Sequence, residues 1–314
     1  MTSISVAADE CAALGNQQPV VKSFPGRDTN LGHLKILRAL PIKGKRLVGP
    51  WCFLDRYGPD TFTEGKPMDV APHPHIGLQT VTWLLEGEIV HHDSLGCEGL
   101  IRPGGVNVMT AGNSIAHAEE TPRGNSGVLN GVQLWVALPE AQRKISPSFR
   151  EIEQVPAVEL RGGGAQVFAG TLAGATSPAP HYSDIVGADL KVHSGAKLIL
   201  PLNLAHEHAL LLLAGDAEIE GQSLDDRNFY YLGTTRSEIG LSSRGGARLL
   251  LIGGQPFPES ILMWWNFVAR TPEGIVVART AWEQRQGFGE VLAYQGPRLS
   301  APPLVRLARP NPAS

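Results

Sequence analysis

The sequence has little cysteine, and its cysteines form no recognisable pattern. Cys11, Cys52 and Cys97 are scattered through 314 residues without a CxxC pair. An odd number of widely spaced cysteines argues against a disulfide framework and against a zinc ribbon, and is typical of proteins in a reducing compartment. We therefore expect a cytoplasmic protein without structural disulfides.

Long hydrophobic runs and an excess of one charge sign are also missing. No uninterrupted apolar stretch approaches the ~20 residues that cross a bilayer. The first 18 residues contain Asp9 and Glu10 and lack the basic and apolar regions of a signal peptide. The 27 basic and 30 acidic residues give a formal charge of −3, with no basic run. The sequence therefore predicts no membrane span and no direct contact with nucleic acid.

Glycine and proline, by contrast, are plentiful, with 36 and 24 residues. This composition favours many turns and short strands over long helices. Runs rich in β-branched and aromatic residues, such as 78–85, 106–111 and 131–138, recur between turn signals, which is typical of an all-β barrel or sandwich. The best helix candidate is 272–286, with Thr271 as its N-cap and a proline at the first position.

The strand pattern is repeated along the chain. Two similar blocks, 19–155 and 165–290, lie on either side of a glycine-rich boundary at 161–164. The segment His206-Glu207-His208 and the apolar run after it mirror His73-Pro74-His75 and its own apolar run, which is a weak internal repeat. We therefore predict two barrels in tandem. Residues 1–18 and 291–314 are interpreted as a mobile N-terminal tail and an extended C-terminal tail.

Two short patterns in the first block each place good metal ligands two residues apart. They are His73 with His75, and His117 with Glu119. Side chains at i and i+2 of a β-strand point to the same face, so each pair can enter one cavity. Three imidazoles and one carboxylate suit a divalent ion such as iron, copper, nickel, zinc or manganese. Pro74 cannot donate to a sheet ladder, so we expect this strand at a barrel edge.

Other polar residues are assigned lesser roles. Glu119 can act as a ligand alone, or also as a catalytic base once substrate displaces it. Because side chains alternate along a strand, only one of His91 and His92 can face inward, and we expect hydrogen-bonding or turn roles for them and for Asp93. The His-x-His pair of the second block has no His-x-Glu partner after it, so we expect no metal there.

These patterns stand in a sequence that resembles the pirin family of bicupins. The resemblance runs from about Val20 to Gln286 and is densest in the first block. The matching segments are GRxxxLG at 26–32, RALP at 38–41, VGPWCFLD at 48–55, APHPHIGLQTVTWLLEGEI at 71–89, HHDSLG at 91–96, IRPGGVNVMTAG at 101–112, IAHAE at 115–119, QLWVALP at 133–139 and WNFVAR at 265–270.

The resemblance implies two stacked cupin barrels (double-stranded β-helix, jelly-roll) with a short C-terminal helix, and one metal, usually iron, in the N-terminal barrel. The family's ligands fall on His73, His75, His117 and Glu119. Some pirins resemble quercetin 2,4-dioxygenases and show that activity, which implies an Fe(II)-dependent dioxygenase for a flavonol-type or other enolic or phenolic substrate. Others regulate transcription factors, so the alternative is a non-catalytic metal- or redox-sensing protein with a protein partner. We expect a monomer in either case.

The sequence departs from the family pattern at three places near the site. Cupins place a glutamate four residues after the second histidine, and here that residue is Gln79, which we expect to alter the surroundings of the metal. The turn often written PGDV is PGGV at 103–106, and residues 112–114 lack a basic residue common there. Gln79, Gln133, Met109 and Trp83 are candidates for the pocket wall, although core packing explains Met109 and Trp83 equally well.

Overall fold

A computed structural model describes residues 21–31, 34–62 and 68–304, and within these ranges the chain is built of antiparallel strands with one short helix. This confirms the predicted all-β class. The predicted tail at 1–18 lies outside the described residues, as does the last part of the predicted C-terminal tail, 305–314.

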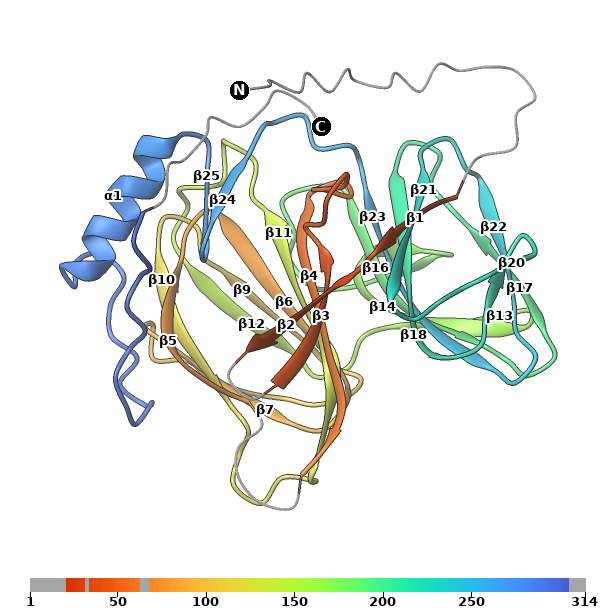
Figure 1. Ribbon diagram of the computed structural model, residues 1–314, viewed down its shortest axis with the longest axis horizontal. Coiled ribbons are helices and arrows are strands. Elements are labelled where there is room, and N and C mark those ends of the chain that lie inside the picture. Colours follow the sequence, from red (N-terminus) through yellow and green to blue (C-terminus); the bar gives the residue numbers. More distant parts are fainter. Residues whose placement is uncertain (1–20, 32–33, 63–67, 305–314) are drawn as a thin grey trace.

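The first barrel consists of a seven-stranded sheet facing a four-stranded sheet (Figure 1). The large sheet, in spatial order, is made of β12 (Ser148–Ile152), β9 (Val106–Thr110), β6 (Leu78–Glu86), β11 (Val128–Ala137), β4 (Trp51–Thr61), β3 (Leu34–Leu40) and β2 (Arg27–Leu31). The small sheet is made of β5 (Asp69–His75), β10 (Ile115–Glu120), β7 (Ile89–Asp93) and β8 (Glu98–Ile101). The strand that carries Pro74 is therefore an edge strand, as predicted.

The second barrel repeats this plan. Its large sheet contains β1 (Lys22–Pro25), β21 (Asn228–Gly233), β18 (Glu207–Gly215), β23 (Ala247–Gly254), β16 (Ile185–Val192), β14 (Gly163–Leu172) and β13 (Ala157–Leu160), with β15 (Ala175–Thr176) paired to β14. Its small sheet contains β17 (Lys197–Pro201), β22 (Glu238–Ser242), β19 (Glu218–Ile219) and β20 (Gln222–Ser223). The described part of the chain thus forms the two tandem barrels that the repeat predicts.

The two large sheets pack against each other and share one hydrophobic core. Trp83 of the first barrel stacks on Phe168 of the second, with ring centroids 5.2 Å apart, and both are fully buried. The indole Nε1 of Trp83 donates a hydrogen bond to Asp189 Oδ2 (2.8 Å). The same carboxylate also accepts hydrogen bonds from two nitrogens of Arg248. Strand β6 lies between this shared core and the interior of the first barrel, and its residues 78–85 are buried on both faces.

Segments from both ends of the chain cross to the other barrel. Strand β1 adds to the second barrel by pairing with β21, although it precedes the first barrel in sequence. The segment β24 (Leu262–Trp264), β25 (Phe267–Ala269) and α1 (Pro272–Glu283) packs against β10, and its Phe267 and Trp282 share one hydrophobic cluster with the alanines of that strand. Sheet pairing and apolar packing, not chain order, decide where these end segments lie. The domain ranges 19–155 and 165–290 stay a prediction.

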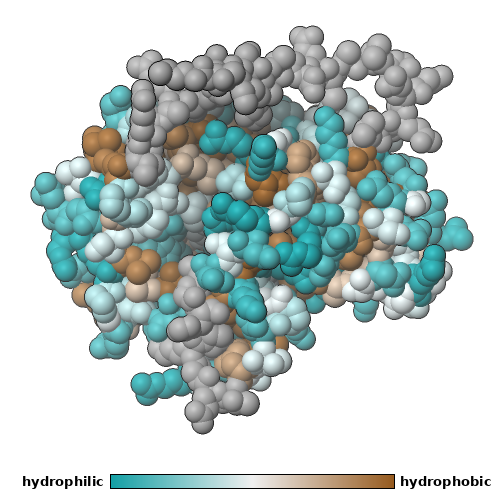
Figure 2. Space-filling model, in the orientation of Figure 1, coloured by the Kyte–Doolittle hydropathy of each residue, from teal (hydrophilic) through white to brown (hydrophobic). Residues whose placement is uncertain are grey.

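Helix α1 begins and ends near the predicted positions. The Thr271 side chain accepts a hydrogen bond from the Gly274 amide, as expected of an N-cap, and Pro272 occupies the first turn. Within the described residues no helix is both long and apolar enough to span a bilayer. On the part of the molecular face in Figure 2 that is not grey, hydrophobic residues lie in scattered small groups among hydrophilic ones.

Replacing Asp189 by alanine should destabilise both barrels together. The change leaves the buried Trp83 Nε1 and the partly buried Arg248 without their carboxylate, which we expect to cost about 3 kcal/mol. Urea unfolding monitored by tryptophan fluorescence measures the loss. Asp28→Ala is the matched control, because it also removes an ion pair between the barrels, with Arg227, but an exposed one. Equal stability of Asp189→Ala and the wild type would contradict a shared core anchored here.

Candidate metal centre

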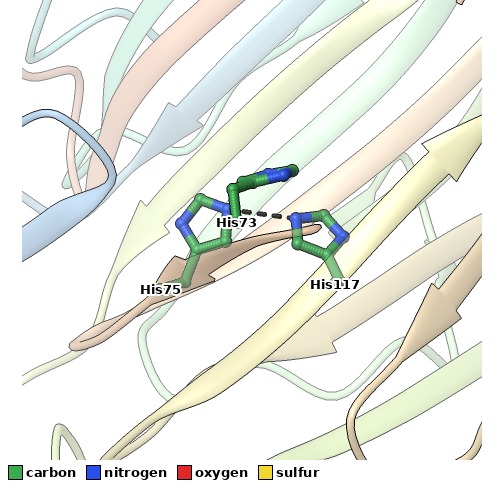
Figure 3. A group of neighbouring side chains, drawn as sticks. All are labelled: His73, His75 and His117. Atoms are coloured by element: carbon green, nitrogen blue, oxygen red, sulfur yellow. Dashed lines mark hydrogen bonds between the residues drawn. The ribbon is translucent and has the colours of Figure 1, made fainter. Parts of the chain in front are cut away.

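The register between β5 and β10 brings the predicted histidines together. His117 lies opposite His73, and Ile115 lies opposite His75. The three histidines are buried, and each offers a ring nitrogen within 4.8 Å of the other two. Figure 3 shows the imidazoles of His73 and His75 on β5 facing that of His117 on β10. The structure therefore places three of the predicted residues where one ion would contact all of them.

Backbone carbonyls determine which nitrogen of two of these rings carries the proton. His73 Nδ1 lies 3.0 Å from the carbonyl oxygen of Ala71, and His75 Nδ1 lies 3.0 Å from that of Asn266. A carbonyl oxygen only accepts, so each Nδ1–H donates and each Nε2 keeps a lone pair. The Nε2 atoms of His75 and His117 are 3.1 Å apart. This arrangement, with one ring nitrogen anchored and the other turned inward, is typical of metal-ligating histidines.

Burial keeps these imidazoles neutral. Desolvation lowers the pKa of His73 to about 4 and holds the pKa values of His75 and His117 well below the ordinary value. Neutral imidazole is the form that binds a cation, so protons compete weakly with a metal for these rings near neutral pH.

Glu119 lies beside this group but does not complete it. Its carboxylate belongs to a second group of potential ligands, which shares His117 and adds His91, again within 4.8 Å of one another. The register of β10 against β5 shifts between His117 and Glu119, so the two side chains are not equally placed toward β5. The assignment of Glu119 and the three histidines as one ligand set stays a prediction.

The environment of Glu119 favours its protonated form. Burial raises the pKa of this carboxyl to about 7, against a weak opposing effect of the Thr82 hydroxyl, whose Oγ1 lies 3.5 Å from Oε1. Glu119 is therefore poised to exchange a proton near neutral pH. This property is required of the catalytic base that the sequence suggested.

The histidines and Glu119 line a cavity of about 400 Å³ inside the first barrel. Alternate residues of β4 form one wall, namely Phe53, Asp55 and Tyr57, and Gln133 and Trp135 of β11 lie beside them. The remaining lining residues are Ile36, Arg38, Met68, Val70, Thr80, Trp265, Asn266 and Leu299. A larger hollow of about 760 Å³ lies on the second barrel and contains none of the predicted ligands.

The wall facing the histidines combines flat aromatic rings with hydrogen-bonding groups. Phe53 stacks on Trp135 with ring centroids 4.1 Å apart, and the Arg38 guanidinium lies 4.6 Å above the Phe53 ring. Arg38 donates two hydrogen bonds to Asp55, of 2.8 and 2.7 Å. The Tyr57 hydroxyl is buried and has no hydrogen-bond partner among the described residues. Sequence reasoning named Gln133 on this side of the cavity but missed Phe53, Asp55 and Tyr57, although the alternation along 53–57 was a usable signal.

The expectation for Gln79 is wrong. Its amide nitrogen donates to Thr110 Oγ1 (2.9 Å) and to the Pro180 carbonyl (3.0 Å), and its oxygen lies 3.2 Å from His181 Nδ1. The side chain therefore joins the two barrels instead of surrounding the metal site. Thr80 lines the cavity, and neighbouring side chains of a strand point to opposite faces. Gln79 therefore lies on the face of β6 that is turned away from the cavity.

Of the other pocket-wall candidates, Gln133 lines the cavity, whereas Met109 and Trp83 belong to the packed cores. His91 and His92 point to opposite faces of β7, which confirms the alternation expected for them. His91 faces the site through His117, whereas His92 faces Glu98 and Glu120 on the other side.

In the second barrel, His206 and His208 repeat the His-x-His pattern but have different surroundings. The rings of His206 and His208 are buried with centroids 5.9 Å apart, and His206 Nε2 lies 3.0 Å from the exposed carboxylate of Asp184. In the described part of the chain these histidines join no group of three potential ligands. The absence of a metal from this barrel stays a prediction.

Two jelly-roll barrels in one chain, with buried histidines at the cavity of the first, define a bicupin with a candidate metal centre. Two family models match the chain: Pirin over residues 33–136, and the Pirin C-terminal cupin domain over residues 187–289. The chain belongs to the pirin family.

Individual relatives agree with this assignment. A Caulobacter vibrioides protein named pirin-like is 37% identical over 83% of this chain and 92% of its own. A Pseudomonas aeruginosa protein provisionally named quercetin 2,3-dioxygenase is 44% identical over 87% of each chain. The crystal structure of a quercetin 2,3-dioxygenase from Acinetobacter baumannii is 43% identical and superposes with a TM-score of 0.89, over 92% of this chain and 97% of that one. Both names say 2,3-dioxygenase, whereas the resemblance suggested a 2,4-dioxygenase.

The affinity for a divalent metal should rise with pH up to about pH 7 and then level off. Glu119 must lose its proton before it can bind a cation, and its pKa of about 7 sets the turning point, while His73, with a pKa of about 4, is already neutral. Competition of Zn²⁺ against a chelator between about pH 5.5 and pH 8 measures this dependence. Glu119→Gln should bind more weakly with little pH dependence, and a flat wild-type profile would contradict the prediction.

Proposed function

We propose that this pirin is an Fe(II)-dependent dioxygenase that acts on a flavonol-type or other enolic or phenolic substrate. The observation that carries the proposal is the convergence of three neutral, buried imidazoles and a carboxyl of pKa about 7 on one cavity with an aromatic wall. A reducing compartment, expected to be the cytoplasm, would keep such an iron ferrous.

The residues present fit a divalent metal. His73 and His75 keep their Nε2 lone pairs for a cation, and Glu119 offers an oxygen within 4.8 Å of a His117 nitrogen. Iron is proposed from the family resemblance, while copper, nickel, zinc or manganese would suit the same donor atoms. When bound, Fe(II) would supply Lewis acidity and the redox chemistry that reaction with dioxygen needs.

The protein's own residues account for binding and proton transfer. A flat phenolic ring fits against the stacked Phe53 and Trp135. Glu119, ionised at pH values above about 7, would accept the proton of the substrate hydroxyl that approaches the metal. The unpartnered Tyr57 hydroxyl would donate a hydrogen bond to a second substrate oxygen, which also satisfies a buried polar group. The closed barrel interior would exclude bulk water from the reacting atoms.

The first test is aerobic turnover of quercetin by iron-reconstituted protein whose metal content has been measured. We expect about one iron per chain and ring cleavage, and His73→Ala should lower the iron content and abolish turnover because it removes one of the three imidazoles of the proposed donor set. His208→Ala removes a buried histidine of the second barrel and should change neither the iron content nor the turnover.

The other outcomes of this test contradict parts of the proposal. Protein with one iron per chain that leaves quercetin and simpler enols unchanged would favour the regulatory alternative, in which the metal changes affinity for a protein partner. Protein that takes up none of the five divalent metals would contradict the metal site itself.

Tyr57→Phe should lower kcat/KM for the phenolic substrate about tenfold, the value of one lost hydrogen bond of about 1.4 kcal/mol. The metal content should stay unchanged, because the phenol belongs to neither group of potential ligands. The free energy of unfolding should stay equal or increase, because the substitution removes a buried hydroxyl that has no protein partner. Steady-state kinetics and urea unfolding test these effects separately, and an unchanged kcat/KM would exclude Tyr57 from substrate binding.

A further inference from the structure

His117 differs from the other two histidines of the cluster in what holds its outer nitrogen. His73 and His75 each donate Nδ1–H to a backbone carbonyl, which is neutral. The Nδ1 of His117 instead lies 3.3 Å from Nδ1 of another imidazole, His91, on the neighbouring strand β7. Two imidazoles facing each other can form a hydrogen bond only if one supplies the proton and the other the lone pair.

A buried carboxylate on the far side of His91 determines which ring supplies the proton. His91 Nε2 lies 3.3 Å from Asp93 Oδ2, and the Asp93 side chain is fully buried. The other carboxylate oxygen, Oδ1, accepts hydrogen bonds from the backbone amides of Leu95 (2.8 Å) and Cys97 (3.0 Å). The His91 ring is held flat against Phe149, with centroids 4.2 Å apart and an angle of 4°. The chain His117–His91–Asp93 is therefore fixed at its outer end.

Asp93 is well suited to be the acceptor at that end. Its Oδ1 accepts hydrogen bonds from two backbone amides, and such bonds favour the ionised form of a carboxyl. An ionised carboxylate can only accept. His91 must then donate through Nε2 and present a lone pair at Nδ1. The Nε2 of His117 also lies 3.1 Å from the Nε2 of His75, which keeps its lone pair, so two contacts compete for the one proton of His117. The carboxylate of Asp93, acting through His91, favours donation through Nδ1 of His117, which leaves the lone pair on Nε2.

We infer that Asp93 and His91 position His117 for metal binding by fixing its tautomer, so that Nε2 is free where the Nε2 atoms of His75 and His73 converge. The inference rests on the proposed metal-dependent function. Asp93 also places a buried negative charge behind this one ligand, which makes His117 a stronger electron donor than its two carbonyl-anchored neighbours. Asp93 and His91 act through His117, and neither lines the cavity.

The local geometry favours this role over a purely structural one. Asp93 does have a structural task, since Oδ1 holds the turn after β7 through Leu95 and Cys97. Oδ2 makes no contact with the backbone of that turn and interacts with His91 instead. An asparagine could hold the turn equally well without placing a charge in the barrel, so the second oxygen is the part of Asp93 that the turn does not explain.

The decisive substitution is Asp93→Asn. The amide keeps an oxygen for the backbone of the turn but presents an NH2 group to His91, which must then accept through Nε2 and donate through Nδ1. The proton of His117 is thereby moved to Nε2, where it blocks the metal. The same logic explains why an aspartate-to-asparagine change disables a histidine in catalytic triads.

We would measure two quantities on the full chain. The first is the Zn²⁺ dissociation constant by chelator competition, which we expect to be about 10- to 100-fold weaker in Asp93→Asn. The second is the tautomer of His117 in the metal-free protein, read from the ¹⁵N shifts of its ring nitrogens. Wild type should show the proton on Nδ1, and Asp93→Asn should show it on Nε2, a change that a merely structural role of Asp93 would not produce.

Two further variants separate the effect of His91 from that of Asp93 and from that of a neighbouring histidine. His91→Gln offers an amide oxygen to His117 Nδ1–H, as the carbonyls do for the other two histidines, so the tautomer should stay and the affinity should fall less than in Asp93→Asn. His92→Gln is the matched control, because His92 adjoins His91 but contacts Glu98 and Glu120 instead of the site. We expect wild-type affinity and tautomer in that variant.

Wild-type Zn²⁺ affinity in Asp93→Asn, or a His117 proton that remains on Nδ1 there, would overturn the inference. If Asp93→Asn fails to fold, loss of the Nδ1 proton in His91→Phe provides the same test without changing the turn. Failure of the wild type to bind Zn²⁺ or Fe²⁺ would instead overturn the proposed function. The tautomer of His117 in the metal-free protein would still test whether Asp93 and His91 fix it.

Discussion

In the antiparallel pair of β5 and β10, His117 lies opposite His73, and every property of the site depends on this register. A slip by one residue would turn one strand's histidines out of the barrel. The register is held from both sides. Strand β7 pairs with the other edge of β10, and the free edge of β5 is covered by the C-terminal segment, where the Leu299 amide donates to the Pro72 carbonyl (2.9 Å). Covering this edge also protects it from pairing with another chain.

The three histidines share one cavity but are held by unlike partners. The partner of His73 is two residues away in sequence, whereas the partner of His75, the Asn266 carbonyl, is 191 residues away on the segment that crosses back from the second barrel. The Nδ1 of His117 faces the imidazole of His91, which in turn contacts the carboxylate of Asp93. The second barrel and the segment after it therefore support the site through packing and one hydrogen bond, without contributing a potential ligand among the described residues.

Local patterns predicted the barrels and the histidines because strand alternation needs only neighbouring residues. The same rule could not place Gln79, since β6 is buried on both faces and its pattern does not tell the cavity from the interface between the barrels. Gln79 looked like part of the metal site because of its distance from His75 in sequence, yet Thr80 enters the cavity. Tyr57 and Asp55 were missed because their role appears only when β3, β4 and β11 close around the histidines.

The sequence by itself determined the all-β class, the two barrels, the N-cap of the helix and the spacing of the histidines, because each depends on residues within one turn or strand. The tertiary structure decided the rest. It fixed the partner of each imidazole, the burial that raises the pKa of Glu119, and the exchange of β1 and α1 between barrels. These features depend on contacts between residues far apart in sequence, and such contacts form only when the sheets pair and the apolar faces are buried together.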